Sequence, residues 1–382
     1  MGEAPPRKER ILILLPSPPD KKLLDEIEEK HPNYEFKYQQ VEFSKRRIPE
    51  EIDDGLLEGV TIVVTSANRL PSPKSTKHIK LIHLFSAGVD RLLTQPTFTD
   101  TNIPFTNSSG VHGPQISEWV ILQILSHAHK QKLLLEWQKK HIWGSHQDLA
   151  PVRDGVGQRL GVLGYGAIGR QSAHIAKSLG IDVIAYTAGA RKTPESKKDH
   201  GYIVPGTGDP DGTVPSEWYS GLDKASLHNF LNQDIDILLV SVPLTPQTHH
   251  FLAAEELAIL GKKNAFIVNI ARGPIIQHDD LIAALKKPTS EGGLRGAALD
   301  VTEPEPLPAN SELWDLENVA ITPHVSGLGT TYGERSLEIL ELNLTNFEEG
   351  KPLINVLSRK LEQGSVGLQP TWAALSKPTL FQ

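Results

Sequence analysis

The chain contains no cysteine among its 382 residues. This absence excludes disulfide bonds, cysteine-ligated metal sites and thiolate nucleophiles, so any catalysis must rely on other side chains. A chain without cysteine fits a reducing compartment, and the cytoplasm is therefore the expected location. No metal site is predicted.

Long apolar runs and an excess of positive charge are missing as well. The N-terminal run ILILLP, residues 11–16, is shorter than the apolar region of a signal peptide and is more typical of a first strand. No run reaches the roughly 20 residues of a membrane span. The formal net charge is −7, which gives no reason to expect a polyanionic partner. Neither a membrane nor a nucleic acid is therefore expected as a partner.

Short apolar runs that alternate with helix-like segments are what the chain does contain. This alternation predicts an α/β fold with parallel sheets and crossover helices. A continuous helix is expected from Pro114 to Lys140, and the Gly-, Pro- and Asp-rich segment 193–233 predicts an inserted surface loop. Six runs in the second part predict a doubly wound sheet, and they span residues 159–164, 181–186, 235–242, 265–270, 296–301 and 319–322.

The segment GVLGYGAIGR, residues 161–170, places three glycines between a predicted strand and a predicted helix. Gly164 suits the tight turn, Gly166 allows the backbone to approach a pyrophosphate, and Gly169 allows the helix to pack closely on the strand. The helix N-terminus would offer free N–H groups to the phosphates. The alternative is a glycine-rich turn without a ligand.

The segment AYTAGARK, residues 185–192, closes the next predicted strand. Thr187 stands about where a dinucleotide-binding protein commonly has an acidic residue for the ribose 2′-hydroxyl, and Arg191 and Lys192 follow it. A hydroxyl and two cations suit a 2′-phosphate, so NADP(H) is the expected cofactor. The alternative is that both cations are solvated and that the site accepts NAD(H).

Three charged residues stand at or just after the ends of predicted strands: Arg272, Glu305 and His324. The carboxyl ends of parallel strands are where such sheets present ligands, so these residues are candidates for catalysis. Any one of them alone would be unremarkable, since single arginines and histidines are more often structural.

The chain resembles the D-isomer-specific 2-hydroxyacid dehydrogenases, and in particular their glyoxylate/hydroxypyruvate reductase branch, from about Gly59 to Val356. The resemblance is carried in order by LFSAGVDRLL, NSSGVHGPQISEW, GVLGYGAIGR, SVPLTPQTHHF, NIARGPIIQHDDL, ALDVTEPEPLP and TPHVSG. The GVHGPQISEW segment is more similar to fungal members than to bacterial ones.

The resemblance implies a role for each candidate. Arg272 would bind the substrate carboxylate and polarise the keto oxygen, and His324 would be the acid–base. Glu305 would orient His324 and favour its charged form. The substrate carboxylate would also be held by backbone N–H groups of the loop formed by Ala87, Gly88 and Val89.

The resemblance also implies a set of cofactor contacts. Asp300 would face the nicotinamide carboxamide, or else serve as a turn carboxylate. His112 would contact the substrate or cap a helix, and Trp119 and Trp143 would line the substrate side or pack in the core. The implied cofactor-binding residues are Gly164, Gly166, Ala167, Ile168, Gly169, Thr187, Arg191, Lys192, Val242, Pro243, Thr248, Ile270, Asp300 and Gly327.

The expected architecture has two doubly wound domains. A flavodoxin-like substrate domain comprises residues 1–118 and 328–382, and an inserted Rossmann NAD(P)-binding domain comprises residues 119–327. The expected activity is reduction of a small 2-oxo acid, glyoxylate or hydroxypyruvate, to the D-2-hydroxy acid, in a homodimer. The alternatives are a dinucleotide-sensing corepressor or scaffold of the same fold and a formate dehydrogenase-like enzyme, which carries an amide where Glu305 stands.

Overall fold

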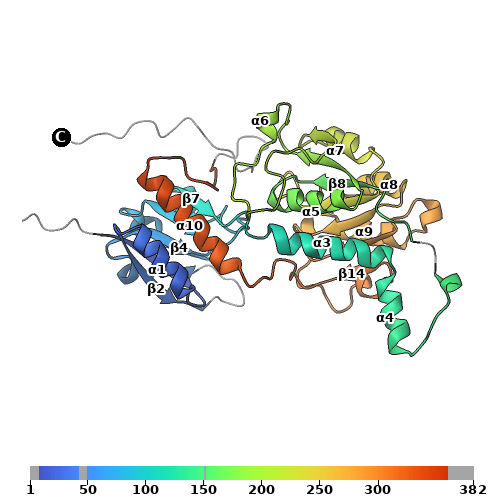
Figure 1. Ribbon diagram of the computed structural model, residues 1–382, viewed down its shortest axis with the longest axis horizontal. Helices are drawn as coiled ribbons and strands as arrows, with labels where there is room; N and C mark the ends of the chain where they lie inside the picture. The colour runs from blue at the N-terminus through green and yellow to red at the C-terminus, as the bar shows by residue number, and fades with distance from the viewer. Residues whose placement is uncertain (1–7, 43–49, 150–151, 360–382) are drawn as a thin grey trace, which may run out of the picture.

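The computed structural model describes residues 8–42, 50–149 and 152–359, which form two parallel sheets with their own helices (Figure 1). The elements of the first half are β1 (Glu9–Leu15), α1 (Lys21–Lys30), β2 (Tyr34–Gln40), β4 (Val60–Thr65), β6 (Leu81–Leu84), α2 (Pro96–Thr99), β7 (Phe105–Asn107) and α10 (Tyr332–Glu348), with a small β3 (Glu50–Glu51) and β5 (Arg69–Leu70) pair. The elements of the second half are α3 (Gly113–Ala128), α4 (Gln131–Lys139), β8 (Arg159–Leu163), α5 (Ala167–Ser178), β9 (Asp182–Thr187), α6 (Pro194–Lys197), β10 (Glu217–Ser220), α7 (Lys224–Leu231), β11 (Ile237–Val240), α8 (Ala254–Gly261), β12 (Phe266–Asn269), α9 (His278–Lys286), β13 (Gly296–Leu299) and β14 (Val319–Ile321).

The first sheet has the strand order β2-β1-β4-β6-β7, which is the flavodoxin-like order. The inner strands β1, β4 and β6 are apolar on both faces because both faces of the sheet are covered, whereas the edge strand β2 is mostly polar and partly exposed. Ile11 and Ile13 of β1 pack in one layer with Leu340 and Leu344 of α10, whereas Leu12 points into the opposite layer. The helix α10 therefore returns from the end of the chain to cover the N-terminal sheet, beside α1 (Figure 1).

The second sheet has the order β10-β9-β8-β11-β12-β13-β14, in which the first strand of the unit, β8, lies at the point where the order reverses. This is the Rossmann arrangement, and ligands bind at that reversal beyond the carboxyl ends of the strands. The sheet is covered on both faces, with Leu163 and Leu238 in one apolar layer and Val162 and Leu239 in the other. The predicted α/β class with two doubly wound units is confirmed. The division at residues 118/119 and 327/328 stays a prediction.

Two expectations about single elements were wrong. The helix expected from Pro114 to Lys140 is divided into α3 and α4, because Lys130 adopts a left-handed backbone conformation with φ of 56°. The segment 193–233 is not only a surface loop, since it contains α6, β10 and α7, and β10 pairs in parallel with β9. Within it, Tyr202 and Asp209 are buried.

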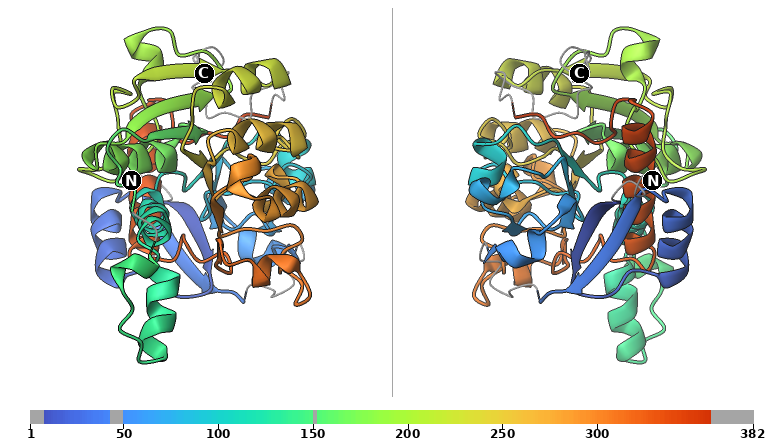
Figure 2. Two further views of the ribbon diagram at one scale, coloured as in Figure 1. Left: turned by 90° about the vertical axis from the view of Figure 1, so that its right-hand side faces the viewer. Right: turned by 90° about the vertical axis from the view of Figure 1, so that its left-hand side faces the viewer.

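The helix α4 extends away from both sheets (Figures 1 and 2). Across the described ranges, no helix combines the length and the apolar character that crossing a membrane requires.

Candidate active site

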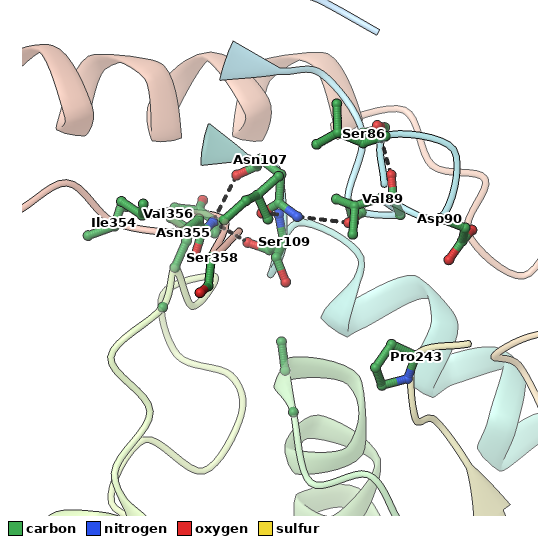
Figure 3. Close-up of a pocket in the computed structure, with 18 of the residues that line it drawn as sticks. Ser86, Val89, Asp90, Asn107, Ser109, Pro243, Ile354, Asn355, Val356 and Ser358 are labelled. Atoms are coloured by element: carbon green, nitrogen blue, oxygen red, sulfur yellow. Dashed lines mark hydrogen bonds between the residues drawn. The ribbon is translucent and has the colours of Figure 1, made fainter. Parts of the chain in front are cut away.

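A cleft of about 2660 Å³ has walls from both halves of the molecule. This volume exceeds the roughly 300–1,000 Å³ of an ordinary small-molecule pocket, so a dinucleotide and a small acid could occupy it together. Figure 3 shows loop residues Ser86, Val89 and Asp90 on one wall and Pro243 across from them. The predicted residues that line the cleft are Ala87, Gly88, Val89, Gly164, Gly166, Ala167, Ile168, Thr187, Arg191, Val242, Pro243, Thr248, Ile270, Arg272, Glu305, His324 and Gly327. Gly169, Lys192 and Asp300 lie outside this lining.

The glycine loop begins where β8 ends. Gly164 has φ of 105°, and a Cβ there would lie 2.7 Å from the backbone of Val242. A Cβ on Gly169 would lie 2.4 Å from the carbonyl oxygen of Gly164, so this glycine permits the close approach of α5. Gly166 has no neighbour within 4 Å of the position of a Cβ, so a side chain there would project into open space. The three positions match the requirements of a pyrophosphate-binding loop.

The N-terminus of α5 faces the same part of the cleft. Gly166 is its N-cap and provides no side-chain hydrogen bond to the first turn, in which Ala167 and Ile168 line the cleft. A helix N-terminus carries free N–H groups and a partial positive charge, both of which favour a phosphate. The loop and the helix together therefore fit the diphosphate of a nicotinamide dinucleotide.

The three residues predicted for a 2′-phosphate lie at or just after the carboxyl end of β9. Two of them, Thr187 and Arg191, line the cleft, and the third does not. The Thr187 hydroxyl donates to the carbonyl of Gly189 at 2.8 Å. Arg191 lines the cleft, and its Nη1 donates to the carbonyl of Ser196 at 2.8 Å. Burial lowers the pKa of Arg191, but an arginine remains charged at neutral pH. Lys192 is exposed and lies outside the lining of the cleft, so Arg191 is the one of the two predicted cations that reaches the cleft.

The loop after β11 supplies further predicted contacts. The hydroxyl of Thr248 donates to the carbonyl of Pro243 at 2.7 Å, and the N–H of Thr245 donates to the Thr248 hydroxyl at 2.8 Å. These bonds fix the loop so that Val242 and Pro243 line the cleft, as Ile270 does from the end of β12. The apolar side chains of this wall suit the flat ring of a nicotinamide.

The predicted substrate loop is fixed by an asparagine that the sequence analysis missed. The side chain of Asn107, at the end of β7, donates to the carbonyl of Ala87 at 2.8 Å. Asn355 in turn donates to the carbonyl of Asn107 at 3.0 Å (Figure 3). Within the described ranges, the backbone N–H groups of Gly88 and Val89 donate no hydrogen bond, which leaves them available to an anion. The position of Asn107 at a strand end was the signal that could have found it.

Arg272 follows β12 and crosses the cleft. The side chain of Asn269 donates to the carbonyl of Arg272 at 3.0 Å and so fixes the turn after the strand. The guanidinium binds Asp90 of the other half through Nε at 2.9 Å and Nη2 at 2.8 Å. Asp90 lies inside the substrate loop, but nothing in the sequence indicated that it would meet an arginine 182 positions away.

His324 and Glu305 form the second part of the site. Nδ1 of His324 lies 2.7 Å from Oε1 of Glu305, and both side chains line the cleft. Because a carboxylate can only accept, Nδ1 carries a proton and Nε2 is the nitrogen that remains for a ligand. The structure therefore brings together Arg272, Glu305 and His324 on a single cleft.

Asp300 has a different position from the one expected of a cofactor contact. Its side chain is buried and accepts hydrogen bonds from the Thr322 hydroxyl at 2.5 Å, the Val325 N–H at 2.9 Å and the Ser326 N–H at 3.0 Å. The N–H of His324 binds the backbone carbonyl of Asp300 at 2.9 Å. The geometry thus matches the alternative of a turn carboxylate, which holds the loop that carries His324.

His112 lines the cleft and stacks on Tyr332, with ring centroids 4.9 Å apart. It is the N-cap of α3 but makes no side-chain capping bond. Burial lowers the pKa of His112 to about 4, so the ring is neutral near pH 7 and adds no charge to the cleft. Trp119 packs on the second sheet and Trp143 is fully exposed, and neither lines the cleft.

A Rossmann sheet, a pyrophosphate-fitting glycine loop, and a histidine–carboxylate pair on the same cleft as an arginine define a dinucleotide-dependent oxidoreductase. The comparison with protein families identifies which one. The model of the D-isomer specific 2-hydroxyacid dehydrogenase, NAD binding domain, matches residues 121–205 and 209–326, and the chain belongs to this family. It is therefore an NAD(P)-dependent enzyme, a 2-oxo acid reductase at the level of the family, and the predicted resemblance is confirmed.

Curated relatives and solved structures agree with this assignment. The chain is 28% identical over 278 residues to a glyoxylate reductase of Thermofilum pendens, and these residues are 72% of this chain and 73% of the relative. A glyoxylate reductase of Thermococcus onnurineus is 30% identical over 292 residues, which are 74% of this chain and 77% of the relative.

Among solved structures, a D-isomer specific 2-hydroxyacid dehydrogenase of Xanthobacter autotrophicus in complex with NADPH and MES is 25% identical, with a TM-score of 0.67 and coverage of 91% of this chain and 98% of that one. The NAD-complexed enzyme of Lactobacillus delbrueckii shares the fold, with 21% identity, a TM-score of 0.66 and coverage of 91% of this chain and 100% of that one.

Proposed function

We propose that the protein reduces small 2-oxo acids, glyoxylate and hydroxypyruvate first among them, to D-2-hydroxy acids, and that it prefers NADPH. The observation that carries the proposal is the pair of His324 and Glu305, 2.7 Å apart, on the cleft that Arg272 and the glycine loop also line. Relatives that are glyoxylate reductases support the substrate class, and the NADPH complex of the Xanthobacter enzyme supports the cofactor class.

Substrate binding uses groups from both walls of the cleft. Arg272 binds the carboxylate and the keto oxygen, since a guanidinium offers parallel N–H donors in one plane. The N–H groups of Gly88 and Val89 bind the same carboxylate from the opposite wall. This arrangement places C2 of the acid next to Arg272 and within the cleft that His324 lines.

Proton transfer is the task of His324. Its Nε2 donates a proton to the keto oxygen during reduction and accepts it during oxidation. Glu305 accepts a hydrogen bond from Nδ1 and so fixes the orientation of the ring, which leaves Nε2 for the substrate. A nicotinamide held against Val242, Pro243 and Ile270 would supply the hydride for reduction or accept it in oxidation. The wall formed by Val242, Pro243 and Ile270 keeps water from that side of the substrate.

The cofactor preference is testable with two neighbouring cations. Arg191→Ala removes the cation on the cleft, and a charge-assisted contact to phosphate contributes about 1.5–3 kcal/mol. We therefore expect KM for NADPH to rise by a factor of about ten or more, with little effect on NADH. Lys192→Ala is the matched control and is expected to change neither value more than about twofold, because Lys192 lies outside the lining.

The functional test is a paired steady-state assay of NADPH and NADH with glyoxylate and hydroxypyruvate. Turnover with preference for NADPH supports the proposal, and preference for NADH would contradict its cofactor part. A folded protein that binds dinucleotide but reduces no 2-oxo acid would contradict the enzyme proposal and favour a dinucleotide sensor of the same fold. Turnover of formate instead would favour the formate dehydrogenase-like alternative.

We also propose that the protein is a homodimer formed through α3 and α4. Leu122, Leu125, Leu133 and Leu135 of these helices are exposed, and Trp143 follows them with its side chain fully exposed. Exposed apolar surface of this kind marks protein–protein contacts. Light scattering should give twice the mass of the chain, and Leu133→Glu should shift it towards the monomer.

A further inference from the structure

Arg272 has a carboxylate partner within the protein. Its Nε and Nη2 lie 2.9 and 2.8 Å from the same oxygen, Oδ2 of Asp90. The backbone of Gly88 lies against the same nitrogen, because a Cβ added there would be 2.5 Å from Nη2. The guanidinium thus meets the substrate loop at two points, and one of them is a negative charge.

Counting the N–H donors of Arg272 shows which of them remain for a substrate. An arginine side chain carries five N–H donors in one plane. Nη1 donates to the carbonyl of Ala271 at 2.6 Å, and Nε and Nη2 are directed at Asp90. One N–H on Nη1 and one on Nη2 form the outer end of the fork. A substrate carboxylate bound at that end would share Nη2 with Asp90.

Two carboxylates that share one guanidinium repel each other. Groups bound to adjacent edges of the fork lie within roughly 6 Å, the range in which like charges disfavour each other's charged forms. The pair of Asp90 and Arg272 is partly exposed, so water screens this repulsion without abolishing it. The substrate must therefore either displace Asp90 or bind beside it.

We propose that Asp90 is a specificity-determining residue that competes with the substrate carboxylate for Arg272. This inference rests on the proposed function, because it assumes that Arg272 binds the acid. A simple carboxylate such as acetate offers Arg272 only a negative charge, which Asp90 already provides. The N–H groups of Gly88 and Val89 would bind either carboxylate, but only a 2-oxo acid adds a keto oxygen that Arg272 can also bind. Asp90 thereby favours 2-oxo acids over simple carboxylates.

The test is Asp90→Asn, which keeps the shape of the side chain and removes its charge. Asp100→Asn is the matched control, since Asp100 is an exposed acid of the same half that lies outside the cleft lining. We expect KM for glyoxylate, with saturating NADPH, to fall about three- to tenfold in Asp90→Asn. The inhibition constant of acetate should fall by a larger factor. Calorimetry should show tighter binding of oxamate, an unreactive 2-oxo acid analogue, to the NADPH-saturated variant.

The outcomes separate this inference from the proposed function. Unchanged or higher KM and oxamate Kd in Asp90→Asn, with turnover retained, would overturn the competition and show that Asp90 positions Arg272 instead. No oxamate binding by either protein would overturn it too. Tighter oxamate binding by Asp90→Asn without turnover in either protein would support the competition and contradict the proposed function. An equal effect of Asp100→Asn would reduce the result to net charge and so overturn the specific role.

Discussion

Asp300→Asn tests whether Asp300 holds the loop of His324 rather than the cofactor. The substitution keeps the size of the side chain and replaces one acceptor oxygen by an NH₂ group. In the structure, one carboxylate oxygen accepts from the Thr322 hydroxyl and the Val325 N–H, and the other accepts from the N–H and the hydroxyl of Ser326. An asparagine can serve one of these two sets and not both.

The expected cost follows from these contacts. Hydroxyl groups can rotate and accept from the new NH₂ group, but a backbone N–H of Val325 or Ser326 cannot. One buried N–H without an acceptor costs about 1–3 kcal/mol, and loss of the negative charge weakens the remaining bonds by about 1 kcal/mol. A total of about 2–4 kcal/mol corresponds to a fall in Tm of roughly 5–12 °C for a unit of this size.

Thermal unfolding and steady-state kinetics are the assays. Besides the fall in Tm, we expect kcat to decrease about ten- to hundredfold, because the loop that carries His324 loses its fixed position. The Kd of NADPH should change less than about threefold. Thr322→Val, which removes one hydroxyl, should cost about 1 kcal/mol. A variant Asp300→Asn with the wild-type Tm and a much weaker affinity for NADPH would refute the reasoning and place Asp300 at the nicotinamide.

Three further predictions concern other parts of the site and the core. His324→Ala should lower kcat by roughly two to four powers of ten and leave the Kd of dinucleotide nearly unchanged; full activity would contradict the acid–base role. Gly166→Ala should weaken dinucleotide binding without loss of Tm, whereas Gly169→Ala should lower Tm, since its Cβ would lie 2.4 Å from the Gly164 carbonyl. Burial lowers the pKa of His83 to about 4, below the unfolded value of about 6.5, so its neutral form is favoured in the folded state. The stability that this provides is complete above pH 6.5 and is lost as the pH falls towards 4, by about 2 kcal/mol at pH 5. The free energy of unfolding of His83→Gln, measured with denaturant, should therefore depend less on pH than that of the wild type. The same pH dependence in both proteins would argue against this role of His83.

The sequence was most informative where local pattern and tertiary structure agree. The glycines of residues 164–169 follow a strand and open a helix; Gly164 and Gly169 each have a steric reason in the structure, whereas Gly166 faces open space in the cleft. Arg272, Glu305 and His324, which follow the ends of predicted strands, all line one cleft, as expected for a parallel sheet.

The sequence was least informative where contacts join distant segments. Nothing local links Asp90 to Arg272, because the contact depends on how the two halves face each other. Asp300 was expected at the cofactor, yet its surroundings are set by a loop that lies 22 to 26 positions further along the chain. The helix breaks after α3 at Lys130, where no glycine or proline indicates a break. The strand β10 was not predicted because it lies in a segment rich in turn-forming residues.

The central claim is that the cleft transfers a hydride to C2 of a small 2-oxo acid and that His324 supplies the proton. The most direct test uses the dinucleotide preferred in the steady-state assay, deuterated at the transferring position of its nicotinamide, with hydroxypyruvate as acceptor. The account predicts D-glycerate with deuterium at C2, and almost none from His324→Ala. Product without deuterium at C2, the L-enantiomer, or equal product from the variant would contradict it.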